Sequence, residues 1–123
     1  MRIDHVQIAM PDGGEDEARA FYLGVLGMAE VEKPDPLRSR GGCWFVLGAC
    51  HVHLGVDPDF RPARKAHPAF LVDVLDDRAA ALQQAGYPVR WSDELPGVDR
   101  FYSEDPFGNR LELIRSGQGL SES

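Results

Sequence analysis

Four side chains with the chemistry of metal ligands recur at matching places along this sequence. His5 is followed by His67 after 62 residues, and His53 is followed by Glu112 after 59 residues. Imidazole and carboxylate together are the ligand set of borderline divalent metals. The pattern therefore predicts one divalent ion, either Zn, Ni, Mn or Fe, held by His5, His53, His67 and Glu112.

Each of these residues has an ordinary alternative when it is considered alone. A single histidine on a half-buried strand is more often a hydrogen-bonded structural or surface group than a ligand. Glu112 stands between Leu111 and Leu113, so simple alternation would turn it towards solvent. The joint occurrence at repeated positions favours the metal site. His51 has the same strand parity as His53, but it lies beside a turn and is expected at the surface.

The elements that must position these residues occur twice in the same order. In each half, apolar residues first alternate as in a strand and then recur at helical spacing up to a glycine, Gly27 or Gly86. Three short apolar runs follow each time. Asp76 or Asp77 can cap the second helix. A repeat of this kind sets the architecture, and it predicts an α+β fold of two βαβββ modules. The elements are expected over 2–9, 18–26, 28–32, 43–47 and 51–56, and again over 67–74, 76–85, 88–91, 100–104 and 110–115.

The linking segments divide the chain into one domain of two modules. Module one is expected to cover residues 1–57 and module two residues 67–115. A Pro-rich connector, residues 58–66, joins them. The polar, Gly- and Ser-rich ending, residues 116–123, is expected to be a flexible tail.

Composition and charge exclude several classes of partner. The 123 residues carry a net charge of −7, which argues against binding to nucleic acid or to an anionic membrane. No stretch approaches the roughly 20 apolar residues of a membrane span, and the N-terminus is not expected to be a signal peptide. The two cysteines form no CxxC motif, so a reducing, cytoplasmic location is predicted.

Four segments resemble the vicinal oxygen chelate superfamily, which includes glyoxalase I, bleomycin-resistance proteins and extradiol dioxygenases. They are IDHVQIAMPD, ARAFYLGVLGM, HPAFLVDVLD and RFYSEDPFGNRLELI, and together they span nearly the whole chain. The helix segment FYLGVLGM and the ending DPFGNRLELI are fairly specific when taken together. The resemblance implies a glyoxalase-like fold, in which two βαβββ modules form an open-sided mixed barrel, and it implies a homodimer.

The resemblance also places the metal ligands of the family on His5, His53, His67 and Glu112. In glyoxalase-like members the second of these positions is usually a carboxylate, whereas it is His53 here. The exchange leaves a divalent site with an excess of positive charge, which favours an anionic or oxygen-chelating substrate. It also removes the second carboxylate that glyoxalase-type proton transfer would use as base. His53 is then either a ligand or the group that moves a proton.

Three further residues are candidates for binding the substrate. Arg100 and Tyr102 share one face of a strand. The resemblance implies that Tyr102 faces the cavity, so Arg100 could clamp a carboxylate or phosphonate there. The alternative is a surface arginine on an edge strand. Trp44 and Phe45 alternate, so one of them should face the cavity, and Trp44 is the candidate; a core role is the alternative for either.

These observations leave three classes of function. The first is a metal-dependent enzyme acting on a small oxygen-chelating substrate, with lyase or isomerase chemistry favoured over dioxygenase chemistry because extradiol enzymes are usually longer. The second is a drug- or ligand-sequestering protein of the bleomycin-resistance type, for which a net charge of −7 would suit a cationic drug. The third is a structural or partner-binding domain, because a fold does not fix a function.

Overall fold

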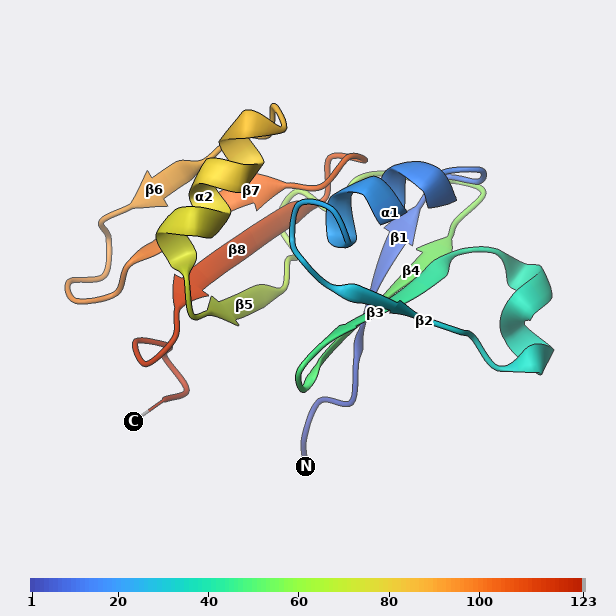
Figure 1. Ribbon diagram of the computed structural model, residues 1–123, viewed down its shortest axis with the longest axis horizontal. Helices are drawn as coiled ribbons and strands as arrows, with labels where there is room; N and C mark the ends of the chain where they lie inside the picture. Colours follow the sequence, from blue (N-terminus) through green and yellow to red (C-terminus); the bar gives the residue numbers. More distant parts are fainter. Residues whose placement is uncertain (123) are drawn as a thin grey trace. The chain divides into compact units, whose positions relative to one another are not determined.

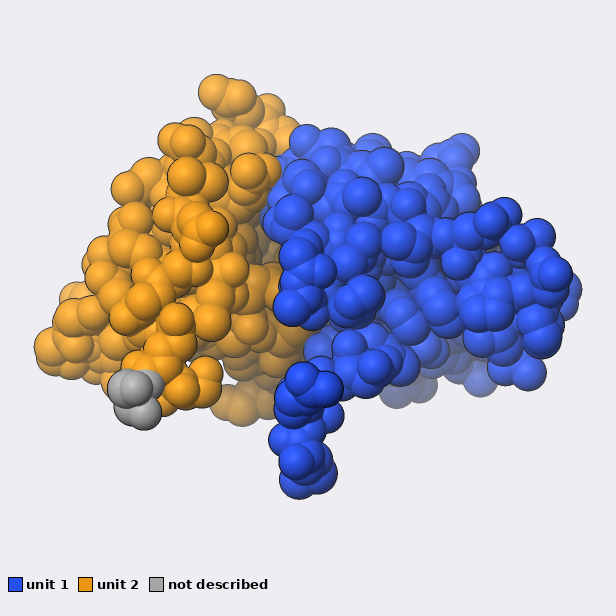
Figure 2. All heavy atoms as spheres, turned by 60° about the horizontal axis from the view of Figure 1, so that its bottom comes forward, with its two compact units in different colours: residues 1–63 blue, residues 64–123 orange. Residues whose placement is uncertain are grey.

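Each half of the chain forms one four-stranded mixed sheet with one α-helix, in a computed structural model that describes residues 1–122 (Figure 1). The contacts divide the chain into a first unit, Met1–Ala63, and a second unit, Arg64–Ser123, which are coloured separately in Figure 2. The predicted α+β fold of two βαβββ modules is confirmed by this element order. The module limits predicted at residues 57 and 67 stay a prediction.

In the first unit, β1 and β4 pair in parallel and the remaining strands pair antiparallel, in the order β1-β4-β3-β2. Alternation directs Phe45 and Val52 to the core face, where Phe45 stacks on Tyr22 of α1 with ring centroids 5.3 Å apart. Trp44 and His53, one residue away from them, lie on the opposite face. The elements are β1 Val6–Met10, α1 Glu15–Tyr22, β2 Ala29–Val31, the 3₁₀-helix η1 Asp35–Arg40, β3 Cys43–Leu47 and β4 Cys50–Val56.

The second unit repeats this topology, with strand order β5-β8-β7-β6 and with β5 parallel to β8. Phe101 and Leu113 are register partners on the core face, which α2 covers with Leu75 and Leu82. Tyr102 and Glu112 are register partners on the other face. The elements are β5 Ala69–Val72, α2 Leu75–Gln84, β6 Arg90–Ser92, β7 Arg100–Glu104 and β8 Arg110–Arg115.

Several predicted element bounds are wrong in a way that matters for the histidines. The first strand begins at Val6 and the fifth at Ala69, so His5 and His67 lie just before their strands. Pro68 explains the second case, because it has no N–H for the ladder while its carbonyl accepts from the N–H of Glu112. The second helix begins at Leu75, which places the predicted caps within its first turn.

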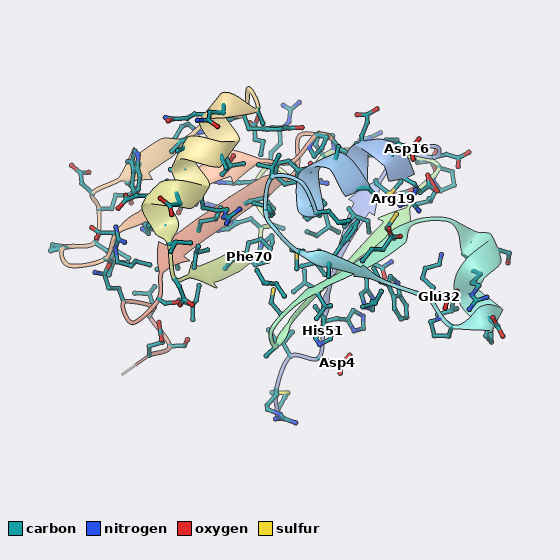
Figure 3. All side chains as sticks on the ribbon, in the orientation of Figure 1. Asp4, Asp16, Arg19, Glu32, His51 and Phe70 are labelled. Carbon is teal, nitrogen blue, oxygen red and sulfur yellow. The ribbon has the colours of Figure 1, made fainter. Side chains whose placement is uncertain are left out.

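Two other segments also differ from the prediction. The first helix ends at Tyr22, before a turn in which the N–H groups of Val25 and Leu26 share the carbonyl of Phe21. The loop after β2 contains η1, which its Pro-rich sequence did not predict. On the surface of α1, Arg19 pairs with Asp16 and with Glu30 of β2; Figure 3 labels Arg19 and Asp16.

Within the described residues, no helix has the length and apolar character needed to cross a membrane.

The close pairing of β3 and β4 depends on the glycine before β3. Gly42 has φ +83°, and a Cβ there would collide with the carbonyl oxygen of Leu54 on β4. Gly48, in the turn between the same strands, has φ +58° and open space around it. Gly42 therefore lets β3 approach β4 closely enough to place Trp44 beside His53.

We predict that Gly42→Ala destabilises the protein more than Gly48→Ala. Both changes force alanine into left-handed backbone, which costs about 1–2 kcal/mol. Gly42→Ala adds a backbone collision, and overpacking of this kind costs about 1–3 kcal/mol more. Urea unfolding of the two variants measures the difference, and equal losses would contradict the close approach of the strands.

Candidate functional site

In the second unit, Arg100 on β7, Glu112 on β8 and His67, which precedes β5, lie together. Glu112 lies on the central strand β8, between Tyr102 of β7 and Ala69 of β5. Nε2 of His67 is 3.0 Å from Oε1 of Glu112, and Nη1 of Arg100 is 3.0 Å from Oε2. Each carboxylate oxygen therefore has its own partner.

The orientation of the His67 ring is set by its other nitrogen. Nδ1 lies 2.8 Å from the carbonyl oxygen of Lys65, and a carbonyl can only accept, so Nδ1 carries a proton. A neutral ring then turns the lone pair of Nε2 towards the carboxylate oxygen of Glu112. Two electron donors at this distance repel each other unless a proton or a metal cation lies between them. Metal-ligating histidines usually donate their second ring N–H to a backbone carbonyl or a carboxylate in this way.

Arg100 and Glu112 form a buried ion pair, with exposed fractions of 7% and 6%. The guanidinium also donates from Nη1 to the hydroxyl of Tyr102 at 2.8 Å and from Nη2 to Oγ of Ser92 at 3.2 Å. The Glu112 carboxylate raises the pKa of Arg100 above its ordinary value. Burying two charges is costly unless they are paired and hydrogen-bonded. Both charges are paired here, although Nε of Arg100 is buried without a hydrogen-bond partner among the described residues.

In the first unit, His53 lies between two aromatic rings. Its ring centroid is 3.8 Å from that of Trp44, its register partner on β3, and 4.0 Å from that of His5. Nδ1 of His5 is 2.8 Å from Oδ2 of Asp4, which again leaves Nε2 as the nitrogen that can face a ligand. The first unit therefore places two imidazoles side by side, one from β4 and one from the residue just before β1.

Burial lowers the pKa of His53, whose exposed fraction is 8%. The neighbouring His5 and His51 act in the same direction and Asp4 opposes them. Asp4 and His51 are labelled at the same end of the first unit in Figure 3. His53 is thus kept in the neutral form that can bind a metal or accept a proton.

The spacing of the two donor atoms in the second unit is that of a hydrogen bond, and it can also be compared with the spacing of two ligands on one metal ion. Two ligand atoms that are each about 2.1 Å from one metal are about 3 Å apart when they subtend a right angle. The separation of Nε2 in His67 and Oε1 in Glu112 is 3.0 Å. Among residues 1–122, however, no three His, Cys, Asp or Glu side chains are grouped so as to hold a metal. The predicted ligands occur as two pairs, one in each unit.

The structure also shows where the other residues predicted from the sequence lie. Tyr102 lies on the Glu112 face of β7, and Trp44 stacks on His53. His51 is exposed, as predicted. Sequence reasoning missed Ser92, which anchors Arg100, and Arg110, whose guanidinium lies 4.2 Å from the centroid of the Tyr102 ring. Only the strand register reveals these partners, and the sequence does not define it.

Comparison with known proteins yields a family and a fold. A family model described as the Glyoxalase/Bleomycin resistance protein/Dioxygenase superfamily matches residues 2–113. The crystal structure of a protein from Bacillus anthracis assigned to the glyoxalase family is 49% identical, with a TM-score of 0.90 and 94% of each chain covered. This similarity confirms the glyoxalase-like fold. A search of curated proteins finds no match.

Two fosfomycin resistance proteins named FosX share the fold at low identity. The one from Mesorhizobium loti is 19% identical with a TM-score of 0.72, covering 98% of this chain and 95% of the other. A variant of the one from Listeria monocytogenes, in complex with Mn(II) and 1S,2S-dihydroxypropylphosphonic acid, is 13% identical with a TM-score of 0.79 and the same coverage.

We predict that Glu112→Ala lowers the free energy of unfolding by about 3–5 kcal/mol, because it leaves the buried charge of Arg100 without its partner. The control is Glu104→Ala on the adjacent strand. Glu104 pairs with Arg90 at 3.5 Å in an exposed position, and pairs of that kind contribute about 0–1 kcal/mol. Urea unfolding compares the two variants. A loss below about 1 kcal/mol for Glu112→Ala would show that the pair contributes little.

We also predict that His53 titrates below its ordinary pKa of 6.5. The folded state disfavours its protonated form, so the unfolded chain binds more protons as the pH falls through about 6.5. Stability should therefore decrease on acidification from that pH, until the lower pKa of the folded state is passed. NMR titration of the imidazole resonances measures the pKa, with His53→Gln to assign the signal. A value at or above 6.5 would contradict the burial argument.

Proposed function

This chain belongs to the Glyoxalase/Bleomycin resistance protein/Dioxygenase superfamily, and from that premise we propose that it is a metal-dependent enzyme acting on a small oxygen-chelating substrate. The observation that carries the proposal is the pair formed by His67 and Glu112. Nε2 and Oε1 face each other at 3.0 Å, and the second nitrogen of the ring is held by a backbone carbonyl. A metal cation between these two atoms would take the place of the proton that their hydrogen bond requires.

The proposed ligands are His5, His53, His67 and Glu112, and the proposed metal is one ion of Zn, Ni, Mn or Fe. The donor set suits these borderline metals. The lowered pKa of His53 supports its part, because only a neutral imidazole can bind a metal. The Mn(II) in the complex of FosX from Listeria monocytogenes is consistent with a metal on this fold.

A bound divalent ion would supply Lewis acidity for negative charge that develops on substrate oxygens. The residues of the chain would do the rest. The hydroxyl of Tyr102 accepts a hydrogen bond from Arg100, so its own proton is free for a substrate oxygen. Trp44 offers an apolar ring next to His53, and Arg100 adds positive charge on the Glu112 face. His53, if it is not a ligand, is the group that can accept a proton near neutral pH.

For this site we propose lyase or isomerase chemistry in preference to dioxygenase chemistry. A homodimer and a cytoplasmic location complete the proposal. The first rests on the resemblance to the family, and the second on two cysteines that lack a CxxC motif.

The alternative is a ligand-sequestering protein of the bleomycin-resistance type. The net charge of −7 favours it, since an acidic protein attracts cationic drugs. The pair of Arg100 and Glu112 argues against it at this site, because the arginine offsets the buried negative charge of Glu112.

We predict that the protein, purified without added metal, contains or takes up one divalent ion at micromolar concentration. His67→Ala and Glu112→Gln should each weaken binding by at least about 10- to 100-fold, because losing even the hydrogen-bond partner of a ligand has an effect of that size. His51→Ala is the matched control, because this histidine is exposed on the same strand as His53, and it should bind as the wild type does.

Elemental analysis and titration with Zn, Ni, Mn and Fe make this measurement. No binding of any of the four metals at micromolar concentration would contradict the metal-dependent enzyme. Tight binding of a cationic drug by the metal-free protein would favour the alternative instead.

A further inference from the structure

We propose that residues 116–122 form a strap that closes the Glu112 face of the second sheet at Leu71, so that a ligand bound at Glu112 has room for a short apolar substituent and not for a long one. The strap is a specificity-determining segment, and Glu122 holds it shut. The inference rests on the proposed function, since it assumes that the ligand binds at Glu112. It adds to that function a limit on the shape of the substrate.

The base of the strap is tied to two neighbouring segments. The N–H of Ser116 donates to the carbonyl of Val72, at the end of β5, over 3.0 Å. The side-chain oxygen of Gln118 accepts from the N–H of Asp99, just before β7, over 2.6 Å. Arg115, the last residue of β8, pairs with the same Asp99 at 2.9 Å. The strap therefore leaves β8 in a defined direction.

One side chain then closes the strap on itself. Oε1 of Glu122 accepts from the N–H groups of Gly117 and Gly119, at 3.0 and 2.9 Å, and the N–H of Glu122 donates to the carbonyl of Gly119. Hydrogen bonds to an ionised acceptor are roughly twice as strong as neutral ones. The strap is otherwise polar and rich in Gly and Ser, so that little else holds it once Glu122 lets go.

Gly119 is the point at which the strap meets the sheet. It is buried, and a Cβ at this position would lie 2.7 Å from Cδ2 of Leu71 and 2.8 Å from Oε1 of Glu122. Gly119 is not among the glycines with positive φ, so its place depends on space and not on a left-handed backbone. Leu71 is two residues from Ala69, the register partner of Glu112, and therefore lies on the Glu112 face.

The Glu112 face has a charged end and an apolar end. At the charged end, the guanidinium of Arg110 lies 4.2 Å from the centroid of the Tyr102 ring. At the other end, register places Leu71 beside Ile114, with exposed fractions of 46% and 6%. An apolar group of a ligand is stabilised by contact with apolar surface, so it should lie at the Leu71 end.

The strap limits how far such a group can extend. Between Glu112 and Leu71 the face carries Ala69, whose small side chain leaves space above β5. Beyond it, the backbone of Gly119 already packs on Leu71. A short substituent ends over Ala69, whereas a longer one meets the strap and must displace it.

A segment that merely packs on the surface would behave differently. Loosening it would affect stability, yet the preference between a short and a long ligand would stay the same. The ratio of the two affinities is therefore the quantity to measure.

The experiment titrates the full chain, loaded with Mn²⁺, with acetohydroxamic acid and with hexanohydroxamic acid in a calorimeter. The two probes offer the same pair of oxygens and differ in the length of the alkyl chain. The wild type should bind the longer probe no more tightly than the shorter one. Glu122→Ala should bind the longer probe about tenfold more tightly than the shorter one, the effect of burying about two further methylene groups.

Two further variants separate the strap from a general loss of structure. Gly119→Ala displaces Leu71 and Glu122 and should behave as Glu122→Ala does. Glu122→Gln keeps an acceptor oxygen for both N–H groups and should keep the wild-type ratio. Thermal unfolding shows that each variant folds. Hydrogen exchange should be about tenfold slower at the amides of Gly117 and Gly119 in the wild type than in Glu122→Ala.

The possible failures are distinguishable. If the wild type binds no metal and neither probe, the proposed function is overturned and the limit on the ligand falls with it, while hydrogen exchange still reports on the strap. A wild type that binds Mn²⁺ and prefers the longer probe by about tenfold overturns the inference alone. So does a ratio that Glu122→Ala and Gly119→Ala leave unchanged, or equally fast exchange at Gly117 and Gly119 with and without Glu122.

Discussion

The buried ion pair of Arg100 and Glu112 is the constraint on which the second unit depends. Each side chain is less than a tenth exposed, so neither charge can be left without the other. The pair ties β7 to β8 directly and reaches β6 through Ser92. It also fixes which oxygen of Glu112 faces His67. The same interaction therefore stabilises the second unit and orients a candidate metal ligand.

The first unit uses the same βαβββ topology with different physics. Its polar face carries stacked rings, Trp44 on His53 and His53 on His5, where the second unit carries charges. Burial and the neighbouring His5 and His51 lower the pKa of His53, whereas hydrogen bonds and an ion pair keep Glu112 oriented. The polar face of the first unit thus presents two imidazoles, and that of the second unit an imidazole with a carboxylate.

The repeat was readable from the sequence, because the period of apolar residues changes from strand to helix and back in both halves. Parity along β7 correctly placed Arg100 and Tyr102 on one face. The burial of Glu112 could not be predicted from the sequence, because a residue between Leu111 and Leu113 could equally well be exposed. Its burial follows from cross-strand register, which pairs it with Tyr102 and brings Arg100 within reach. Ser92 and Arg110 escaped prediction for the same reason.

The central claim is that His67 and Glu112 hold one divalent ion while Arg100 keeps the second carboxylate oxygen. Anomalous diffraction at the manganese edge, from crystals of the full chain grown with Mn²⁺, tests it most directly. We predict one anomalous peak within about 2.3 Å of both Nε2 of His67 and Oε1 of Glu112, with Arg100 still bonded to Oε2. A peak elsewhere, or a Glu112 that binds Mn²⁺ through both oxygens after leaving Arg100, would contradict it.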